Sequence, residues 1–245
     1  MRYPFSAADF EKKVRHFPTI MARLTLFAVV FSPSIASAQV QPAKKGCDTP
    51  LIAAIHDKNV EEAGRFIKSG ADLDAKACAE GETALTESIA EGVPSVAERL
   101  ILAGASPNLS DNKRITPLMY AAWYCNEHIE ALLLKHGALV NATDTDGFSA
   151  LLHAASNCTD GVIVAMLLRS GATVNLRSRD GETALTLAVF NGDENAVREL
   201  VAAGADLTVR TGEGETALSV AKNRSVGRKP DHDRILSFLQ KVTNP

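Results

Sequence analysis

Apolar residues recur along the chain in short helical stretches that alternate with turns containing glycine. The clearest example is residues 180–206. In its first half, Leu185 and Val189 fall on one face of a helix, and Thr183 precedes that helix as an N-cap. In its second half, apolar residues return at spacings of three and four until Gly204, which can adopt the left-handed conformation at a helix end. The pattern predicts two short antiparallel helices.

The same unit recurs along most of the chain. A hydroxyl residue caps the first helix of each copy, Leu follows two positions later, and successive caps are 33 or 34 residues apart. The caps are Thr49, Thr83, Thr116, Ser149, Thr183 and Thr216. Five copies end in Gly-Ala, at Gly70, Gly104, Gly137, Gly171 and Gly204. Because one helix pair cannot bury both of its faces, the copies are expected to stack on one another.

A period of 33 residues with Thr-Pro-Leu, a paired Ala and a closing Gly-Ala resembles the ankyrin repeat, and the resemblance covers residues 47–240. It implies an all-α solenoid of about six helix-pair repeats with short hairpin loops. After Thr-Pro-Leu the family usually has His, and this chain has other residues there: Ile52, Thr86, Met119, Leu152, Thr186 and Ser219. We expect the three hydroxyl side chains of this row to replace the hydrogen bonds of the histidine.

The family also has a turn glycine two positions before the cap. In this chain it is present as Gly81, Gly147, Gly181 and Gly214. Cys47 and Arg114 replace it in the first and third copies. Glycine is the residue that takes a positive φ without strain, so the sequence leaves these two turns open. The sixth copy is stretched by residues 223–231 and lacks the closing Gly-Ala, and we expect the two end copies to act as caps.

The start of the chain predicts a secretory signal peptide. Arg23 precedes an apolar run at 24–31, and the small residues 36–38 follow as a signal-peptidase pattern. The run is shorter than the ~20 residues of a permanent membrane helix, although an uncleaved anchor is the alternative. Residues 1–20 are either a long n-region or precede a start at Met21. The predicted organisation is signal peptide 1–38, linker 39–46 and ankyrin-repeat domain 47–245.

Composition and motifs narrow the function. The chain has 245 residues, 46% of them hydrophobic, and a formal net charge of -3, a balance that suggests no nucleic-acid partner. Removal of the signal peptide would make the mature chain more acidic. HExxH, phosphate-binding glycine loops and G-x-S-x-G are missing from the sequence. Cys125 and His128 offer only two metal ligands. We therefore expect no catalytic residues, metal or cofactor.

Cysteine usage agrees with export. All four cysteines lie in the mature part, and an even number favours disulfides there. Cys125 and Cys158 both lie nine residues after their caps, at the turn between the helices of successive copies, and Cys47 and Cys78 lie in the first two hairpin regions. Packed helices are commonly about 8–10 Å apart, whereas a disulfide needs Cα atoms within about 7 Å. An extra residue near 157–161 could let the fourth turn lean towards Cys125. The candidate bonds are therefore Cys125–Cys158 and Cys47–Cys78. The alternative is four separate thiols.

The resemblance also implies a position for a binding site. Ankyrin-like stacks usually bind through their hairpin tips and the exposed side of the inner helices. On this chain those positions give an apolar patch of Ile115, Trp123, Tyr124, Phe148 and Phe190. Acidic residues would surround it, namely Glu82, Asp146, Asp180, Glu182 and Glu215. The alternative is that the aromatic side chains complete the core.

These observations favour an exported, non-enzymatic module that binds another protein through the concave face of the repeats. The expected partner has a basic rim and an apolar centre. We expect a monomer in the periplasm or secreted, with neither nucleic-acid binding nor stable membrane insertion. The alternatives are an immunity-type inhibitor that covers a toxin and a secreted effector directed at a host protein. An enzyme is disfavoured because no paired acid and base or nucleophile constellation is present.

Overall fold

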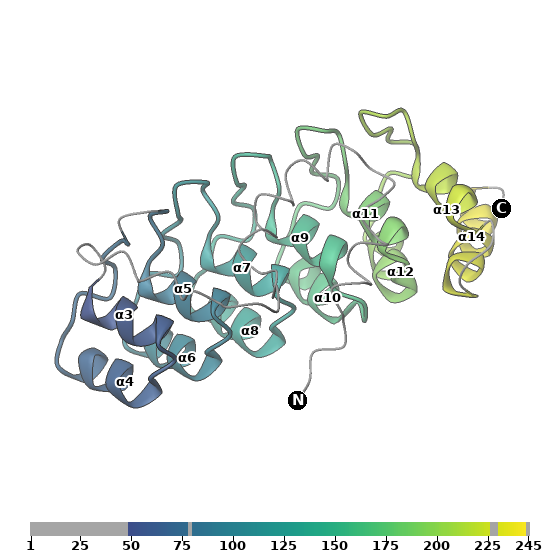
Figure 1. Ribbon diagram of the computed structural model, residues 1–245. Coiled ribbons are helices and arrows are strands. Elements are labelled where there is room, and N and C mark those ends of the chain that lie inside the picture. Colours follow the sequence, from purple (N-terminus) through teal and green to yellow (C-terminus); the bar gives the residue numbers. More distant parts are fainter. Residues whose placement is uncertain (1–48, 78–79, 226–229, 244–245) are drawn as a thin grey trace, which may run out of the picture. The chain divides into compact units, whose positions relative to one another are not determined.

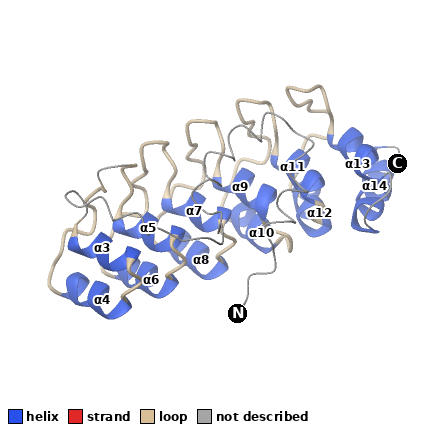
Figure 2. Cartoon of the chain, viewed as in Figure 1, coloured by secondary structure: helices blue, strands red, loops and turns tan. Residues whose placement is uncertain are grey.

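The computed structural model describes residues 49–77, 80–225 and 230–243. They belong to one compact unit, Lys44–Pro245. The described residues form six pairs of α-helices without a strand (Figure 2). In chain order, the helices are α3 (Pro50–His56), α4 (Val60–Lys68), α5 (Ala84–Ala90), α6 (Pro94–Leu102), α7 (Pro117–Trp123), α8 (Glu127–Lys135), α9 (Ala150–Asn157), α10 (Val162–Arg169), α11 (Ala184–Asn191), α12 (Glu194–Ala202), α13 (Ala217–Ser225) and α14 (Pro230–Thr243). The predicted signal peptide and linker, together with Cys47 and Cys78, lie outside the described residues.

The helix pairs stack in two rows (Figure 1). The inner row consists of α3, α5, α7, α9, α11 and α13, and each of these helices packs against the next. The outer row consists of α4, α6, α8, α10, α12 and α14, which pack in the same serial way. Hairpin loops extend from the inner row in Figure 1. The structure therefore confirms the predicted all-α solenoid of helix pairs.

Hydroxyl caps begin the inner helices. In each pair the cap oxygen accepts a hydrogen bond from the backbone amide three residues later, as between Ile52 N and Thr49 Oγ1 at 3.3 Å. In three pairs the side-chain hydroxyl of the residue three positions after the cap also accepts a hydrogen bond from the backbone amide of the cap. Thr83 N donates to Thr86 Oγ1 at 2.8 Å, and equivalent bonds form in α11 and α13. The expectation that hydroxyls replace the family histidine is confirmed.

The core lies between the two rows. The leucine that follows each cap by two positions is at most 1% exposed in the first five pairs, from Leu51 to Leu185. The outer helices contribute residues such as Leu100, Leu133 and Leu200, all fully buried. Full burial of one such side chain contributes roughly 1.5–3 kcal/mol, so stacking rather than intrinsic helix propensity stabilises these short helices.

One hairpin turn keeps its conformation without glycine. Gly81 and Gly147 have φ values of 77° and 83°, and Arg114 occupies the equivalent position with φ 63°. A side chain in this left-handed region costs about 1–2 kcal/mol. The turn that the sequence left open therefore has the same shape as its neighbours, at a local cost in stability.

Asparagine side chains connect successive repeats. Asn108 donates to the carbonyl of Gly137 at 3.1 Å and accepts from Leu139 N at 2.8 Å. Asn141 and Asn175 make the equivalent pair of bonds to the loops that follow them. We call these three residues the asparagine ladder. It holds each loop, and the hairpin that the loop enters, at a fixed spacing from the next one.

Candidate functional site

Two buried carboxylates shape the central hairpins. Asp111 Oδ1 accepts from the amides of Lys113 and Ile115 at 2.9 and 2.7 Å, which closes its own turn. Its other oxygen accepts from Tyr120 on α7, at 3.1 Å. Asp144 does the same one repeat later, and its second bond is to His153 on α9. Each carboxylate therefore fixes a hairpin to the inner helix that follows it.

His153 lies at the centre of an aromatic cluster, formed by Trp123, Phe148 and His153. Its ring centroid is 5.1 Å from that of Trp123 and 5.2 Å from that of Phe148. His153 is only 3% exposed, whereas Trp123 and Phe148 are half-buried. The bond of 3.2 Å between His153 Nε2 and Asp144 Oδ2 holds the imidazole in place. Residues from two helices and one hairpin thus form one rigid group.

The electrostatics of this group favour an ionised Asp144. Burial acts to raise the pKa of its carboxyl, but the hydrogen bond and charge of His153, with two backbone amides, lower it below the ordinary value. A carboxylate has no proton to donate, so Nε2 of His153 must be the donor. Nδ1 of the same ring is buried and has no hydrogen-bond partner in the structure. The cluster therefore contains one unsatisfied polar atom.

The remaining apolar residues of the predicted patch differ in exposure. Tyr124, directly after α7, is 39% exposed. Ile115 and Phe190 are half-buried and pack partly against the core, as Phe148 also does. The guanidinium of Arg224 lies 3.5 Å from the Phe190 ring centroid. The structure thus joins Trp123 to Phe148 through His153, while Phe190 is engaged with α13.

The predicted acidic residues also fall into different environments. Glu182 is 6% exposed and accepts from Ser178 Oγ at 3.1 Å, so its carboxylate stabilises its own hairpin. Glu215 accepts from Asn223 at 2.8 Å. The backbone carbonyls of Asp146 and Asp180 accept amide hydrogen bonds from the next hairpin, which joins the hairpins into a continuous row. A binding role for these residues remains a prediction.

Glu82 differs from the other acidic residues because its surroundings oppose the ionisation of its carboxyl. Burial is the largest effect, and the charges of Glu87, Asp111 and Glu80 add to it, so that the pKa of Glu82 is raised to about 7. We call these four residues the acidic cluster. Of this cluster, only Glu82 belongs to the acidic rim predicted from the sequence. The periodic positions of Asp111 and Asp144, nine residues before Tyr120 and His153, were the signal that could have identified both buried pairs.

A disulfide joins the turns next to the aromatic cluster. Cys125 and Cys158 are bonded, with Cα atoms 5.6 Å apart. The spacing of helix axes does not prevent the bond because neither residue lies in a helix body. Cys125 has φ 54° in the turn after α7, and Cys158 follows α9 in an extended conformation. The predicted pairing in register is present, and it ties the ends of α7 and α9 together.

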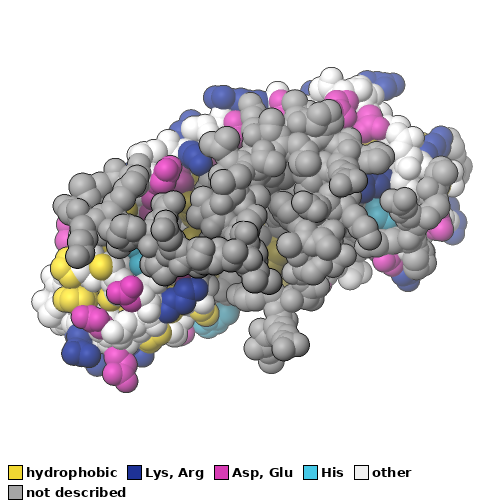
Figure 3. Space-filling model, viewed as in Figure 1, with side chains coloured by type: hydrophobic (Ala, Val, Ile, Leu, Met, Phe, Trp, Pro, Cys, Tyr) yellow, Lys and Arg dark blue, Asp and Glu magenta, His cyan; other side chains and the backbone are white. Residues whose placement is uncertain are grey.

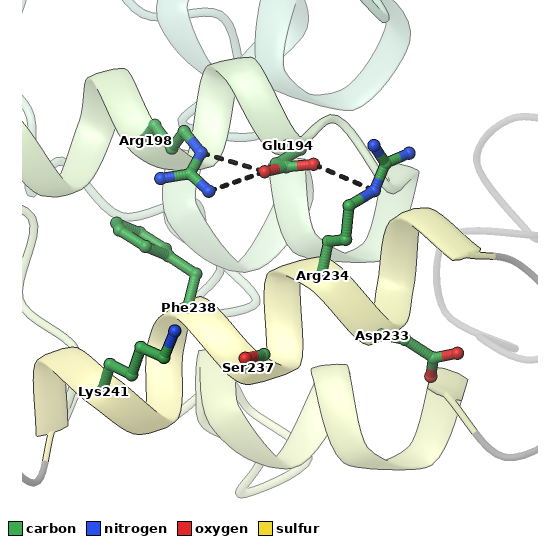
Figure 4. Close-up of a pocket in the computed structure, with 7 residues that line it drawn as sticks. All are labelled: Glu194, Arg198, Asp233, Arg234, Ser237, Phe238 and Lys241. Carbon is green, nitrogen blue, oxygen red and sulfur yellow. Dashed lines mark hydrogen bonds and ion pairs between the residues drawn. The ribbon is translucent and has the colours of Figure 1, made fainter.

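An open cavity of about 440 Å³ lies between α12 and α14 (Figure 4). It is lined by Glu194, Arg198, Asp233, Arg234, Ser237, Phe238 and Lys241. Glu194 bridges the two arginines, at 2.7 Å to Arg198 and 3.3 Å to Arg234, and Arg198 also lies over the ring of Phe238. Because both guanidinium groups are already paired, this cavity is best explained as a contact that fixes α14 on α12.

The described ranges give little support for a metal site or a membrane span. These ranges contain no group of three or more His, Cys, Asp or Glu side chains placed to hold a metal ion. None of their helices is both long and apolar enough to cross a membrane. In the view of Figure 3, acidic and basic side chains lie interspersed near both ends of the helical stack. Among the described residues, the most distinctive site consists of the aromatic cluster, Tyr124 beside it, and the acidic cluster.

The stacked helix pairs and their hairpins define a helical repeat solenoid. The family model described as ankyrin repeats (3 copies) matches residues 88–178 and 151–229, together more than half of the chain. The chain belongs to the ankyrin-repeat family, which confirms the resemblance seen in its repeats. A Treponema pallidum (strain Nichols) protein described as ankyrin repeat-containing is 33% identical over 105 residues. The match spans 42% of this chain and 35% of that relative. Ankyrin repeats are generally protein–protein interaction modules and typically non-enzymatic.

Proposed function

We propose that this chain is an exported, non-enzymatic module that binds a partner protein on the inner-helix face, centred on Trp123 and Tyr124. The observation that carries the proposal is the aromatic cluster. Its half-buried rings, Trp123 and Phe148, lie against His153, which a buried hydrogen bond to Asp144 holds in place. Aromatic side chains that are positioned before binding lose little conformational entropy, and such residues dominate the binding energy of protein interfaces.

The disulfide supports export. A bond between Cys125 and Cys158 persists in an oxidising compartment and is rare where glutathione keeps thiols reduced. The signal-peptide pattern of residues 1–38 points to the same compartment. Expression of the full chain in a bacterium, followed by fractionation and mass spectrometry without reduction, tests both parts. Recovery of the protein from the cytoplasm with free thiols at Cys125 and Cys158 would refute the export.

A matched pair of variants tests the binding face. The variant Trp123→Ala/Tyr124→Ala is expected to weaken partner capture at least thirtyfold, since loss of a hot spot costs about 2 kcal/mol or more. The control is Leu102→Ala/Leu139→Ala, which removes side chains that are 62% and 61% exposed, at the end of α6 and after α8. Capture from a periplasmic extract would be quantified by mass spectrometry, and circular dichroism would verify folding. Equal capture by both variants contradicts the proposed site.

A further inference from the structure

The inner-helix face combines an acidic part with an aromatic part. Glu82 precedes α5, is half-buried, and takes part in none of the ion pairs among the described residues. The negative charges of Glu87, Asp111 and Glu80 act on it, and Glu87 itself lies 3.4 Å from His56 of α3. A half-buried carboxyl among like charges is complementary to a cationic group supplied from outside.

The aromatic part offers a different kind of contact. Trp123 and Phe148 are half-buried around His153, which is 3% exposed. The Nδ1 atom of His153 is buried and has no hydrogen-bond partner, which is unfavourable for a polar atom. A bound segment that places a side chain against the rings and a hydrogen-bonding group near Nδ1 would satisfy this atom.

The stacking of the repeats sets the distance between the two parts. The acidic cluster lies at α5, Trp123 ends α7, and His153 lies on α9, and these inner helices are direct neighbours. Packed helices are about 8–10 Å apart, so the two parts are separated by about 10–20 Å. An extended chain advances about 3.3 Å per residue, and the distance therefore corresponds to roughly three to six residues.

We propose that the partner supplies an extended segment with two anchors. A lysine or arginine lies against Glu82, and an aromatic or large aliphatic side chain, three to six residues away, lies against Trp123 and Phe148. This inference rests on the proposed function and specifies the chemistry of the ligand at the same face.

Proton binding gives the acidic anchor a measurable signature. The pKa of Glu82 is about 7 in the free protein, because burial and the charges of Glu87, Asp111 and Glu80 oppose its ionisation. Two titratable groups of the neighbouring helices also face this cluster: Tyr120 on α7 interacts with Glu82, and His56 at the end of α3 pairs with Glu87. A cation from the ligand favours the ionised form, so binding strengthens as the pH rises through 7 and weakens as it falls. Between pH 8 and pH 6 the affinity is expected to drop by up to about tenfold.

A random library of displayed twelve-residue peptides provides the probe. The full chain, with its disulfide intact, is used for selection at pH 8, and enriched peptides are measured by fluorescence anisotropy at pH 6 and pH 8. We expect enrichment of a basic residue three to six positions from an aromatic or large aliphatic one. Glu82→Gln should bind these peptides about tenfold more weakly at pH 8 and without pH dependence. The control Glu61→Gln, at an exposed position on α4, should bind like the wild type.

The possible results separate the two levels of the proposal. Peptides that require Trp123 but lack the basic anchor, or that bind Glu82→Gln as tightly as the wild type, overturn this inference and leave the proposed function standing. Peptides that bind Trp123→Ala unchanged overturn the proposed site as well. A selection without enrichment over the uncoated support overturns both.

Discussion

Glu82 should make the stability of this protein fall as the pH rises from acidic to neutral. In the unfolded chain a glutamate has a pKa near 4.3, whereas in the folded protein the pKa of Glu82 is about 7. Between these values the folded state binds more protons than the unfolded state. The free energy of unfolding therefore decreases from about pH 4.5 to pH 7 and is then constant with respect to this group.

The magnitude follows from the shift and the exposure of Glu82. A fully buried group with this shift would contribute about 3.5 kcal/mol, at 1.36 kcal/mol per pKa unit. Glu82 is only half-buried, so solvent screening reduces the contribution to about 1–2 kcal/mol. The isosteric variant Glu82→Gln cannot ionise. It should match the wild type at pH 4.5 and be about 1 kcal/mol more stable at pH 8.

Urea denaturation of both proteins between pH 4.5 and pH 8, followed by far-ultraviolet circular dichroism, measures the difference directly. Glu61→Gln, which alters an exposed residue of α4, controls for the loss of one negative charge. Stacked repeats can unfold in more than one step, so the comparison requires that the urea dependence of the unfolding free energy has the same slope in all three proteins. A Glu82→Gln effect that is equal at both ends of the pH range would refute the reasoning.

Three further predictions concern stability. Thr186→Val should lower the free energy of unfolding by about 1–3 kcal/mol, because the buried amide of Thr183 loses its acceptor, whereas Thr186→Ser should retain most of that stability in the same denaturation assay. Cys125→Ser/Cys158→Ser should cost about 2–4 kcal/mol relative to the unreduced wild type, and a midpoint that dithiothreitol does not change would contradict it. Arg114→Gly should raise the melting temperature by about 2 °C by calorimetry, and a decrease would show that φ 63° is not strained.

The period of the sequence was sufficient to predict the fold. A hydroxyl, a leucine two positions later and a terminal glycine each act within a few residues, and repetition at 33 or 34 residues then leaves stacking as the way to bury the helices. Hydrogen bonds that replace the family histidine were predictable for the same reason, since Thr83 and Thr86 are three residues apart. Local chemistry and register together determine these features.

The site was less predictable because it depends on how residues of different repeats meet. Sequence position placed Glu182 at the rim, but Ser178 in the same hairpin binds its carboxylate. Nothing in the sequence distinguishes His153 from other inner-helix residues, because its bond to Asp144 spans nine residues and a loop. The usual distance between packed helices argues against the disulfide, and only the backbone of the two turns brings the Cα atoms of Cys125 and Cys158 within bonding distance. Exposure and pairing are tertiary properties that a one-dimensional pattern does not contain.

The asparagine ladder repeats the same contact in the interior repeats. Each contact, or rung, joins one asparagine to the Gly-Ala loop of the next repeat. Tandem duplication of an interior unit would bring both halves of a new rung with it, so the array could lengthen during evolution without compensating substitutions. The ends do not have this freedom. Asp74 accepts an amide hydrogen bond but its carboxylate has nothing to donate, and Thr208 bonds back to Asp206. New recognition surface is therefore expected to arise in the middle of the stack, beside the rings that already lie there.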